Sequence, residues 1–189
     1  MNSKSDSLKN TFLVSMPSYC EHPFGDSILY ICHHGEYGSM ALQLNTRYPM
    51  DLHAMLTHLD IPCEDSFVNQ PLYRGGDKQA ERGFVLHPFN ACDNWLSSYQ
   101  VSDELSLTSS LDILEAIASG QGPAKSVIAL GYTGWKPGEL EQQISDNLWL
   151  SCPANLAIIF DTAAPAKMQA AATQLGVDLD TIATVSGRA

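Results

Sequence analysis

Positive charge is scarce in this sequence of 189 residues: ten Lys and Arg stand against 21 Asp and Glu, which gives a formal net charge of −11. Binding to nucleic acid or to an anionic membrane surface draws much of its affinity from clustered Lys and Arg. The charge balance therefore disfavours both kinds of partner. No apolar run approaches the ~18–20 residues of a membrane-spanning helix, and residues 1–10 lack the apolar core of a signal peptide. We expect a cytoplasmic protein.

Paired cysteines are also lacking. The five cysteines form an odd set without a C-x-x-C pair, unlike the even sets of oxidised secreted scaffolds. We therefore expect free thiols. They are Cys20, Cys32, Cys63, Cys92 and Cys152.

Metal-site spacing is absent in the same way. Structural zinc prefers two pairs of ligands, each two to four residues apart. The one suggestive group is Cys20, His22, Cys32, His33 and His34, in which the adjacent histidines of a strand would point to opposite faces. We predict neither a metal nor a cofactor.

Catalytic motifs are missing as well: there is no G-x-S-x-G elbow, no H-E-x-x-H helix and no EF-hand loop. The segment 120–126 superficially resembles a phosphate-binding loop. Its spacing is wrong, and it leaves a helix and enters a strand, whereas a phosphate loop leads from a strand into a helix N-terminus. We assign no catalytic residue.

The hydrophobic pattern predicts an α+β fold in one domain over residues 1–189, with residues 1–9 frayed. Apolar residues at Leu52, Met55, Leu56 and Leu59 predict a short helix over 51–59. A second helix over 110–119 would bury Leu111, Ile113, Leu114 and Ile117, with Gly120 as its cap. Further helices are predicted at 137–147 and 165–175. Strands are predicted at 11–16, 27–32, 40–44, 71–74, 83–87, 104–108, 125–132 and 155–160, with a tight turn at 35–38.

This order mixes hairpins with strand–helix–strand units. It favours one bent sheet, mixed or mostly antiparallel, flanked by helices.

Two segments contain more glycine, aromatic or basic residues than a simple turn between strands requires. The segment 131–141 combines three glycines with Tyr132 and Trp135, and it continues into an acidic helix start at Glu139 and Glu141. It is either a helix cap with a buried Trp or a surface platform on which the two aromatic rings grip a ligand or partner. The segment 73–87 contains Gly75-Gly76 among basic residues. It is either a solvated loop or a seat for a small anion.

Taken in order, these segments resemble the YqgE/AlgH family of bacterial proteins over almost the whole chain. The matching pieces are Thr11-Phe12-Leu13-Val14-Ser15-Met16-Pro17, then His34, Gly38-Ser39-Met40 and Asn45, then Gly75-Gly76, Arg82-Gly83-Phe84-Val85-Leu86-His87, Gly131-Tyr132-Thr133-Gly134-Trp135, Pro137-Gly138-Glu139-Leu140-Glu141 and Trp149-Leu150.

The resemblance implies a single α+β domain whose sheet curls into a pseudo-barrel. It implies no agreed activity. The family is named partly for a proposed transcriptional-regulator role in polysaccharide production, and many of its members are uncharacterised. The sequence departs from the family pattern at Asp77-Lys78, where Pro-Val is usual, at Ala41, where Gly is usual, at Gln143, where Glu is frequent, and at Met168, where Trp is common.

We interpret the chain as a regulatory or interaction module that acts through a protein partner or a small ligand. Its expected contact surface consists of His34, Asn45, Arg74, Gly75, Gly76, Arg82, His87, Gly131, Tyr132, Gly134, Trp135, Gly138 and Glu141. The alternative is an enzyme or small-anion binder in which His34, Arg82, His87 and Glu141 converge in one cleft.

Overall fold

The structure, a computed structural model, describes residues 7–17 and 24–179. Its strands are β1 (Thr11–Ser15), β2 (Ile28–Gly35), β3 (Gly38–Gln43), β4 (Arg47–Asp51), β5 (Pro71–Arg74), β6 (Lys78–Pro88), β7 (Ser98–Gln100), β8 (Leu105–Thr108), β9 (Val127–Trp135) and β10 (Trp149–Pro153). Its helices are α1 (Leu52–His58), α2 (Leu111–Ala118), α3 (Glu139–Ser145), α4 (Leu156–Phe160) and α5 (Lys167–Thr173), with a 3-10 turn, η2, at Ala164–Ala166.

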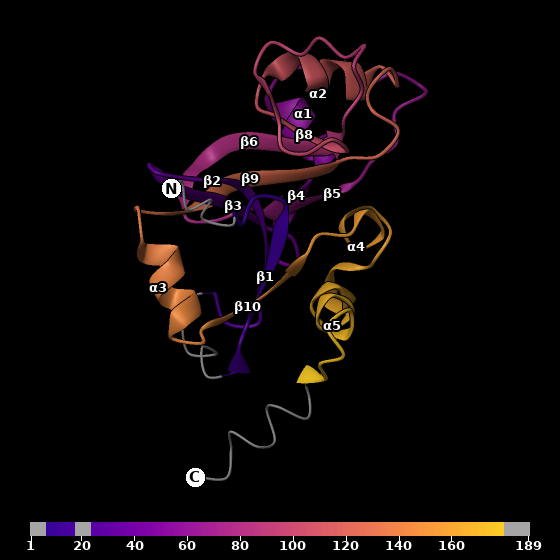
Figure 1. Ribbon diagram of the computed structural model, residues 1–189. Helices are drawn as coiled ribbons and strands as arrows, with labels where there is room; N and C mark the ends of the chain where they lie inside the picture. The colour runs from indigo at the N-terminus through magenta and orange to yellow at the C-terminus, as the bar shows by residue number, and fades with distance from the viewer. Residues whose placement is uncertain (1–6, 18–23, 180–189) are drawn as a thin grey trace.

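The ten strands form one curled sheet in the order β10-β1-β2-β3-β9-β6-β8-β7. Strand β5 pairs with β9 in parallel, and β4 pairs with β5. All pairs other than β5–β9 are antiparallel. Figure 1 shows β9 between the two halves of the molecule, because β6 pairs along one edge of it and β5 and β3 pair along successive parts of the other edge. The predicted α+β fold with a bent, mostly antiparallel sheet and flanking helices is confirmed.

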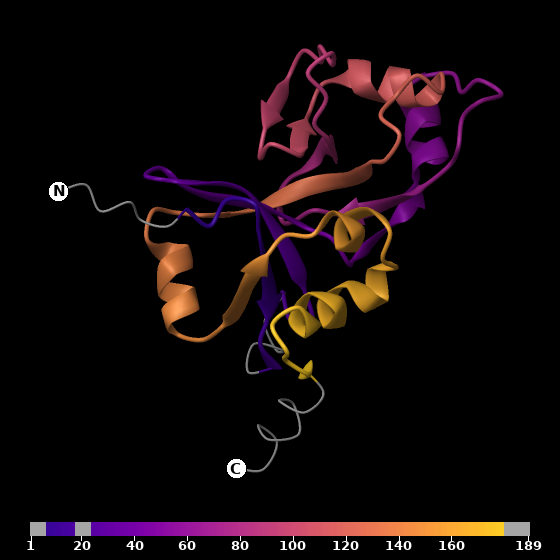
Figure 2. The same ribbon diagram turned by 45° about the vertical axis from the view of Figure 1, so that its right-hand side comes forward.

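Three apolar clusters follow from the curl. The largest lies on the concave side of the sheet and includes Tyr30, Phe84 and Leu107, with residues of α4 and α5 packed into it. On the convex side, α1 and α2 cover β5, β6 and β9, and α3 covers β1, β2 and β3. Figure 2 shows α3 and α5 on opposite sides of the β1–β10 pair, as alternating inward and outward residues on strands require.

Most predicted elements are present, with shifted ends. The 35–38 turn joins β2 to β3, and Leu52, Met55 and Leu56 are the buried face of α1. On α2, however, Leu111 lies in the first turn and is exposed. The strands β4, β7 and β10 were not predicted.

The strand predicted at 155–160 is wrong: these residues form helix α4. The Asn155 side chain accepts a hydrogen bond from the Ala157 backbone N–H at 2.9 Å and caps the helix. A five-residue apolar run has no decisive periodicity, so the capping residue was the better signal.

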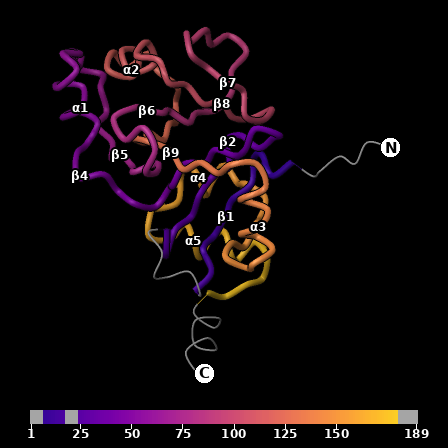
Figure 3. The backbone as a smooth tube through the Cα atoms, turned by 90° about the vertical axis from the view of Figure 1, so that its left-hand side faces the viewer, coloured from indigo at the N-terminus to yellow at the C-terminus, as the bar shows by residue number. Residues whose placement is uncertain are grey.

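The N-terminal prediction also needs correction. Residues 1–6 lie outside the described part of the chain, but Leu8 and Lys9 are held in place. The Leu8 N–H donates to His34 Nδ1 at 3.3 Å, and Lys9 Nζ donates to the Gln100 carbonyl at 3.1 Å. In Figure 3 the N-terminal segment enters beside β2, and β7 lies above it at the free end of the sheet.

The four cysteines in the described segments, Cys32, Cys63, Cys92 and Cys152, are free thiols, and Cys20 lies outside them. Burial raises the pKa of Cys32 and of Cys152 above the usual range of a thiol. None of the helices in the described part of the chain is long and apolar enough to span a bilayer.

One cation is built into the core. Lys167, at the start of α5, is 1% exposed, and its Nζ donates to the carbonyls of Ile158 and Ile159, which end helix α4. Burial lowers the pKa of Lys167 to about 8, and the charge of Asp161 opposes this effect. The ammonium group offsets part of its desolvation by binding two carbonyls at the negative end of a helix.

We predict that the contribution of Lys167 to stability depends on pH with a defined sign. Its pKa in the folded state lies below the ~10.4 of an unfolded chain, so between about pH 8 and 10.4 the unfolded state binds more protons. The free energy of unfolding of the wild type, minus that of Lys167→Met, should therefore rise with pH across this window. Urea titrations of both proteins at pH 7, 8, 9 and 10 measure this difference, in which the shared thiols and tyrosines cancel. A difference that is flat or falls with pH would contradict the assignment.

Candidate functional site

The structure brings the two glycine-rich segments together. After β5 the chain crosses β9 at Gly75-Gly76, where the Gly75 N–H donates to the Leu130 carbonyl at 2.8 Å. Strand β6 then begins with Lys78 opposite Tyr132. A Cβ atom on Gly75 would lie 2.2 Å from the Gly131 carbonyl oxygen, and one on Gly76 would lie 2.1 Å from the Tyr132 carbonyl carbon. These glycines are buried and permit two backbones to cross in contact.

Trp135, expected on a surface platform, is instead part of the core. Its indole is 8% exposed and lies edge-on to that of Trp149, with ring centroids 6.3 Å apart. Both indole N–H groups donate to the same acceptor, Gln143 Oε1, at 2.9 and 2.8 Å. The indole N–H therefore has an internal acceptor. Gly138 starts helix α3 in the left-handed region, with φ of 81°.

His34 and Glu141 do meet. His34 Nε2 lies 3.0 Å from Glu141 Oε1, and its Nδ1 accepts the Leu8 N–H. Since Nδ1 is an acceptor, the ring proton is on Nε2, which donates to the carboxylate. His33 points the other way, toward the Tyr99 hydroxyl, as expected for neighbours on a strand.

The remaining predicted residues do not join this pair. Asn45 binds the backbone at Ile28 and Asp26, so it holds a turn. His87 is 1% exposed; its Nδ1 donates to the Pro88 carbonyl and its Nε2 lies 2.9 Å from the Thr108 hydroxyl. Burial lowers the pKa of His87, which keeps the ring neutral. Arg74 is exposed at the end of β5.

Arg82 lies at the surface of β6 and does not approach these residues. Its guanidinium donates to the Ser109 hydroxyl at 2.8 Å and lies over the Phe84 ring, 5.4 Å from the centroid. The four residues of the alternative cleft thus bind three separate sets of partners, which leaves the convergence expected of an acid/base site unsupported. Both ring nitrogens of His34 and of His87 are already occupied.

A groove at the open end of the curled sheet is the strongest candidate site. It has two lobes, of about 280 and 540 Å³, which share His33 and Met40. These volumes are near or within the range of small-ligand sites. We call the whole the mouth groove. Its apolar lobe is lined by His33, Met40, Phe84, Ser97, Ser98, Tyr99, Leu107 and Ser109. Its basic lobe is lined by His33, Tyr37, Gly38, Ser39, Met40, Lys78, Tyr132, Gly134, Trp135, Lys136, Pro137 and Glu139.

Cations gather around the mouth groove. Lys78 and Lys136 line the basic lobe, Arg82 binds Ser109 at the edge of the apolar lobe, and Lys9 Nζ lies 4.6 Å from the Tyr99 ring centroid. Within residues 7–17 and 24–179 the ion pairs are His34–Glu141 and Lys125–Asp161, so none of these four is in an ion pair there. Among the described residues that line the groove, the one carboxylate is that of Glu139, which accepts the Lys136 N–H. The groove is therefore a basic site on an acidic protein.

Comparison with known proteins decides the family. The profile of the AlgH-like family matches residues 12–180. The chain belongs to the AlgH-like family. A UPF0301 protein of Hahella chejuensis is 40% identical over 189 residues, covering all of both chains. A UPF0301 protein of Thioalkalivibrio sulfidiphilus is 42% identical over 185 residues, which is 98% of each chain.

Two solved structures have the same fold. The solution structure of AlgH from Pseudomonas aeruginosa is 38% identical and gives a TM-score of 0.79, covering 100% of this chain and 98% of that one. A crystal structure of a Corynebacterium diphtheriae protein gives a TM-score of 0.68 at 16% identity, covering 97% and 94%. The resemblance drawn from the sequence is thus confirmed.

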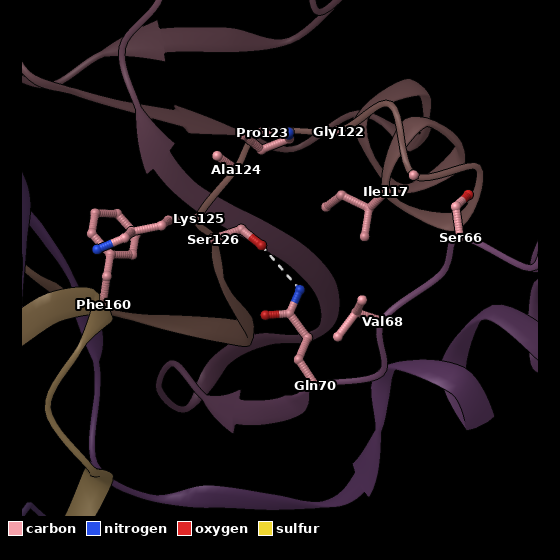
Figure 4. A pocket seen from close by; sticks show the side chains of 11 residues that line it. Ser66, Val68, Gln70, Ile117, Gly122, Pro123, Ala124, Lys125, Ser126 and Phe160 are labelled. Atoms are coloured by element: carbon pink, nitrogen blue, oxygen red, sulfur yellow. Dashed lines mark hydrogen bonds between the residues drawn. The ribbon is translucent and has the colours of Figure 1, made fainter.

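A second cavity, of about 410 Å³, lies beside the segment 120–126 of this AlgH-like chain. Figure 4 shows Gln70 and Ser126 joined by a 3.0 Å hydrogen bond across it, with Val68 and Ile117 on one side and Phe160 on the other. Helix α2 ends beside this segment, so its negative end, and not an N-terminus, faces the cavity. Lys125 is already bound to Asp161 at 2.5 Å. This arrangement disfavours phosphate, as the sequence order predicted.

We predict that Gly76 tolerates no side chain. Gly76→Ala puts a methyl group into the backbone of β9 and should lower the free energy of unfolding by at least about 3 kcal/mol. Gly83→Ala is the matched control, because its Cβ would meet only Leu130 Cδ2, at 4.0 Å. Chemical unfolding of both variants measures the effect, and equal stabilities would refute the backbone crossing.

We also predict that Gln143 supports the fold. Gln143→Leu leaves two buried indole N–H groups without an acceptor and should cost roughly 1–3 kcal/mol for each. Gln143→Glu keeps the shared oxygen and should retain most of the stability. Urea unfolding followed by Trp fluorescence tests this; a Leu variant as stable as the Glu variant would contradict it.

Proposed function

We propose that this AlgH-like protein is a regulatory binding module located in the cytoplasm, and that the mouth groove is its binding site. The ligand or partner segment combines an apolar group with negative charge. The observation that carries the proposal is the coincidence, at one place on a chain of net charge −11, of an apolar floor and cations that form no ion pair with any described residue.

The apolar lobe supplies the binding energy. Met40, Phe84 and Leu107 come from three different strands, β3, β6 and β8. An apolar ligand group that packs among them would be removed from water, which favours binding. Tyr99, 42% exposed, adds an aromatic wall with a polar tip.

The cations supply selectivity. The Arg82 guanidinium has donors to spare beyond Ser109 and Gln79, and Lys78 projects from the first residue of β6. Hydrogen bonds from such cations to a carboxylate or phosphate are about twice as strong as neutral ones. The same positive charge discourages cationic ligands.

Binding is better supported than histidine-based catalysis. Each ring nitrogen of His34 and His87 already has an internal partner, so neither can take a proton from a substrate while these contacts last. A regulatory role would then be exerted through the bound molecule, which agrees with a net charge of −11 that disfavours DNA contact.

The test uses 8-anilinonaphthalene-1-sulfonate as the probe, because it joins an aromatic group to an anion. We expect its addition to ¹⁵N-labelled protein to shift amide signals of Met40, Tyr99 and Leu107. The double variant Lys78→Gln/Arg82→Gln should bind the probe at least about tenfold more weakly, since two charge-assisted contacts are lost. Arg47→Gln removes an exposed cation on β4, outside the groove, and should bind as the wild type does. Signal shifts centred on Gln70 and Ser126, or equal affinity of the double variant, would overturn the proposal.

A further inference from the structure

Strand β7 has an edge beside the apolar lobe that pairs with no other strand in the described part of the chain. Backbone bonds join Ser109 N–H to the Ser97 carbonyl and Val101 N–H to the Leu105 carbonyl, and the register between them pairs Tyr99 with Leu107. Because hydrogen-bonded pairs alternate in an antiparallel ladder, Tyr99 bonds to β8, whereas Ser98 and Gln100 direct their N–H and carbonyl groups away from it. β7 is also the last strand of the sheet.

The sheet does not close on this side. β1 pairs with β2 from Ile28 to Tyr30, and before it the Asn10 N–H donates to the Ile31 carbonyl, so residues 8–10 run beside the far end of β2. We call the space between this side of the sheet and β7 the seam; in the described part of the chain no backbone pairing crosses it. Side chains bridge the seam: the Tyr99 hydroxyl is 3.5 Å from His33 Nδ1, and Lys9 Nζ binds the Gln100 carbonyl. These contacts are exposed, and an entering strand can replace them.

Exposed strand edges are templates for pairing with another chain, which proteins usually protect. In the described part of the chain, Lys9 protects the edge of β7: its ammonium group donates to the Gln100 carbonyl. When an incoming backbone N–H takes that carbonyl, the ammonium group is released beside the new strand. An acidic side chain on that strand gains a partner at this point.

Resting on the function proposed above, we propose that the seam receives an extended acidic segment of a partner protein, which adds to β7 as a further strand. One apolar side chain enters the apolar lobe between Met40, Phe84 and Leu107. Flanking carboxylates face Lys9, Arg82 and Lys78. Backbone bonds to Ser98 and Gln100 supply affinity, and the lobe and the cations supply specificity, as in other cases of strand addition.

The probe is a fluorescein-labelled peptide of eight residues with one central Phe flanked by Glu and Asp. Fluorescence anisotropy should show binding to the wild type. Replacing its Phe with Ser, or its acidic residues with their amides, should each weaken binding at least about tenfold. A neutral or Ser-containing peptide that binds as well as the acidic Phe peptide would overturn the proposal.

A pair of variants isolates the edge bonds. Ser98→Pro removes the outward N–H, which an edge strand tolerates, and Ser98→Ala keeps it; both lose the hydroxyl contact to Thr108. We expect Ser98→Pro to bind the peptide at least about tenfold more weakly than Ser98→Ala. Leu96→Ser, an exposed apolar residue outside the groove, is the surface control. Equal binding by the Pro and Ala variants would exclude strand addition.

Hydrogen exchange of the wild type gives a readout that needs no variant. The peptide should protect the amides of Ser98 and Gln100, while that of Tyr99, already bonded to β8, changes little. If the naphthalene sulfonate maps to the groove but no peptide protects these amides, the strand proposal fails and the binding function stands. If neither probe reaches the groove, both fail. A peptide-independent dimer through β7, seen by analytical ultracentrifugation, would assign the edge to a second copy and overturn the proposal.

Discussion

The backbone crossing of Gly75-Gly76 over β9 is the constraint on which the rest of the structure depends. At this point the chain leaves β5, parallel to β9 on one side, and returns as β6, antiparallel to it. Any side chain at Gly76 would collide with β9 backbone atoms 2.1 Å away. Because β9 also pairs with β3, the crossing joins both halves of the sheet and sets its curl. The mouth groove exists only because the curled sheet places Met40 of β3 opposite Leu107 of β8.

The sequence predicted those parts of the fold whose signal is local. The spacing of Leu52, Met55 and Leu56 predicts helix α1, and the short glycine turn predicts the β2–β3 hairpin. Strand β7, in contrast, is three exposed residues, Ser-Tyr-Gln, whose extended form is imposed by pairing with β8. Helix α4 is five apolar residues, which fit the periodicity of a strand as well as that of a helix. Only the Asn155 cap distinguishes the two.

The site was harder to predict than the fold because only part of it comes from a motif: Tyr132, Gly134 and Trp135 of the predicted segment line the basic lobe, whereas the apolar lobe comes from other strands. The glycine and tryptophan motif predicted a contact surface at 131–141. The Trp135 N–H instead donates to Gln143, eight residues away, and shares this acceptor with Trp149 from another strand. Nothing local in the sequence shows that convergence. The groove, in turn, takes Met40, Tyr99 and Leu107 from strands whose order in space differs from their order in the chain. Lys78, the first residue of β6, also lies within it.

A basic groove on an acidic protein limits how a partner can be held. Charges separated by more than about 8–10 Å are screened at physiological ionic strength, so an anion in the groove interacts mainly with the nearby charges. These are the cations Lys9, Lys78, Arg82 and Lys136 and the carboxylate of Glu139. Farther out, the net charge of −11 repels the same anion. Charge alone therefore cannot bring a strongly acidic partner in quickly, and short-range contacts must retain it. An apolar lobe and an open strand edge are contacts of that kind, because neither acts beyond direct touch. In the binding mode proposed above, both features lie among the four cations, so an acidic segment that fills the lobe gains short-range contacts that an anion without an apolar group does not.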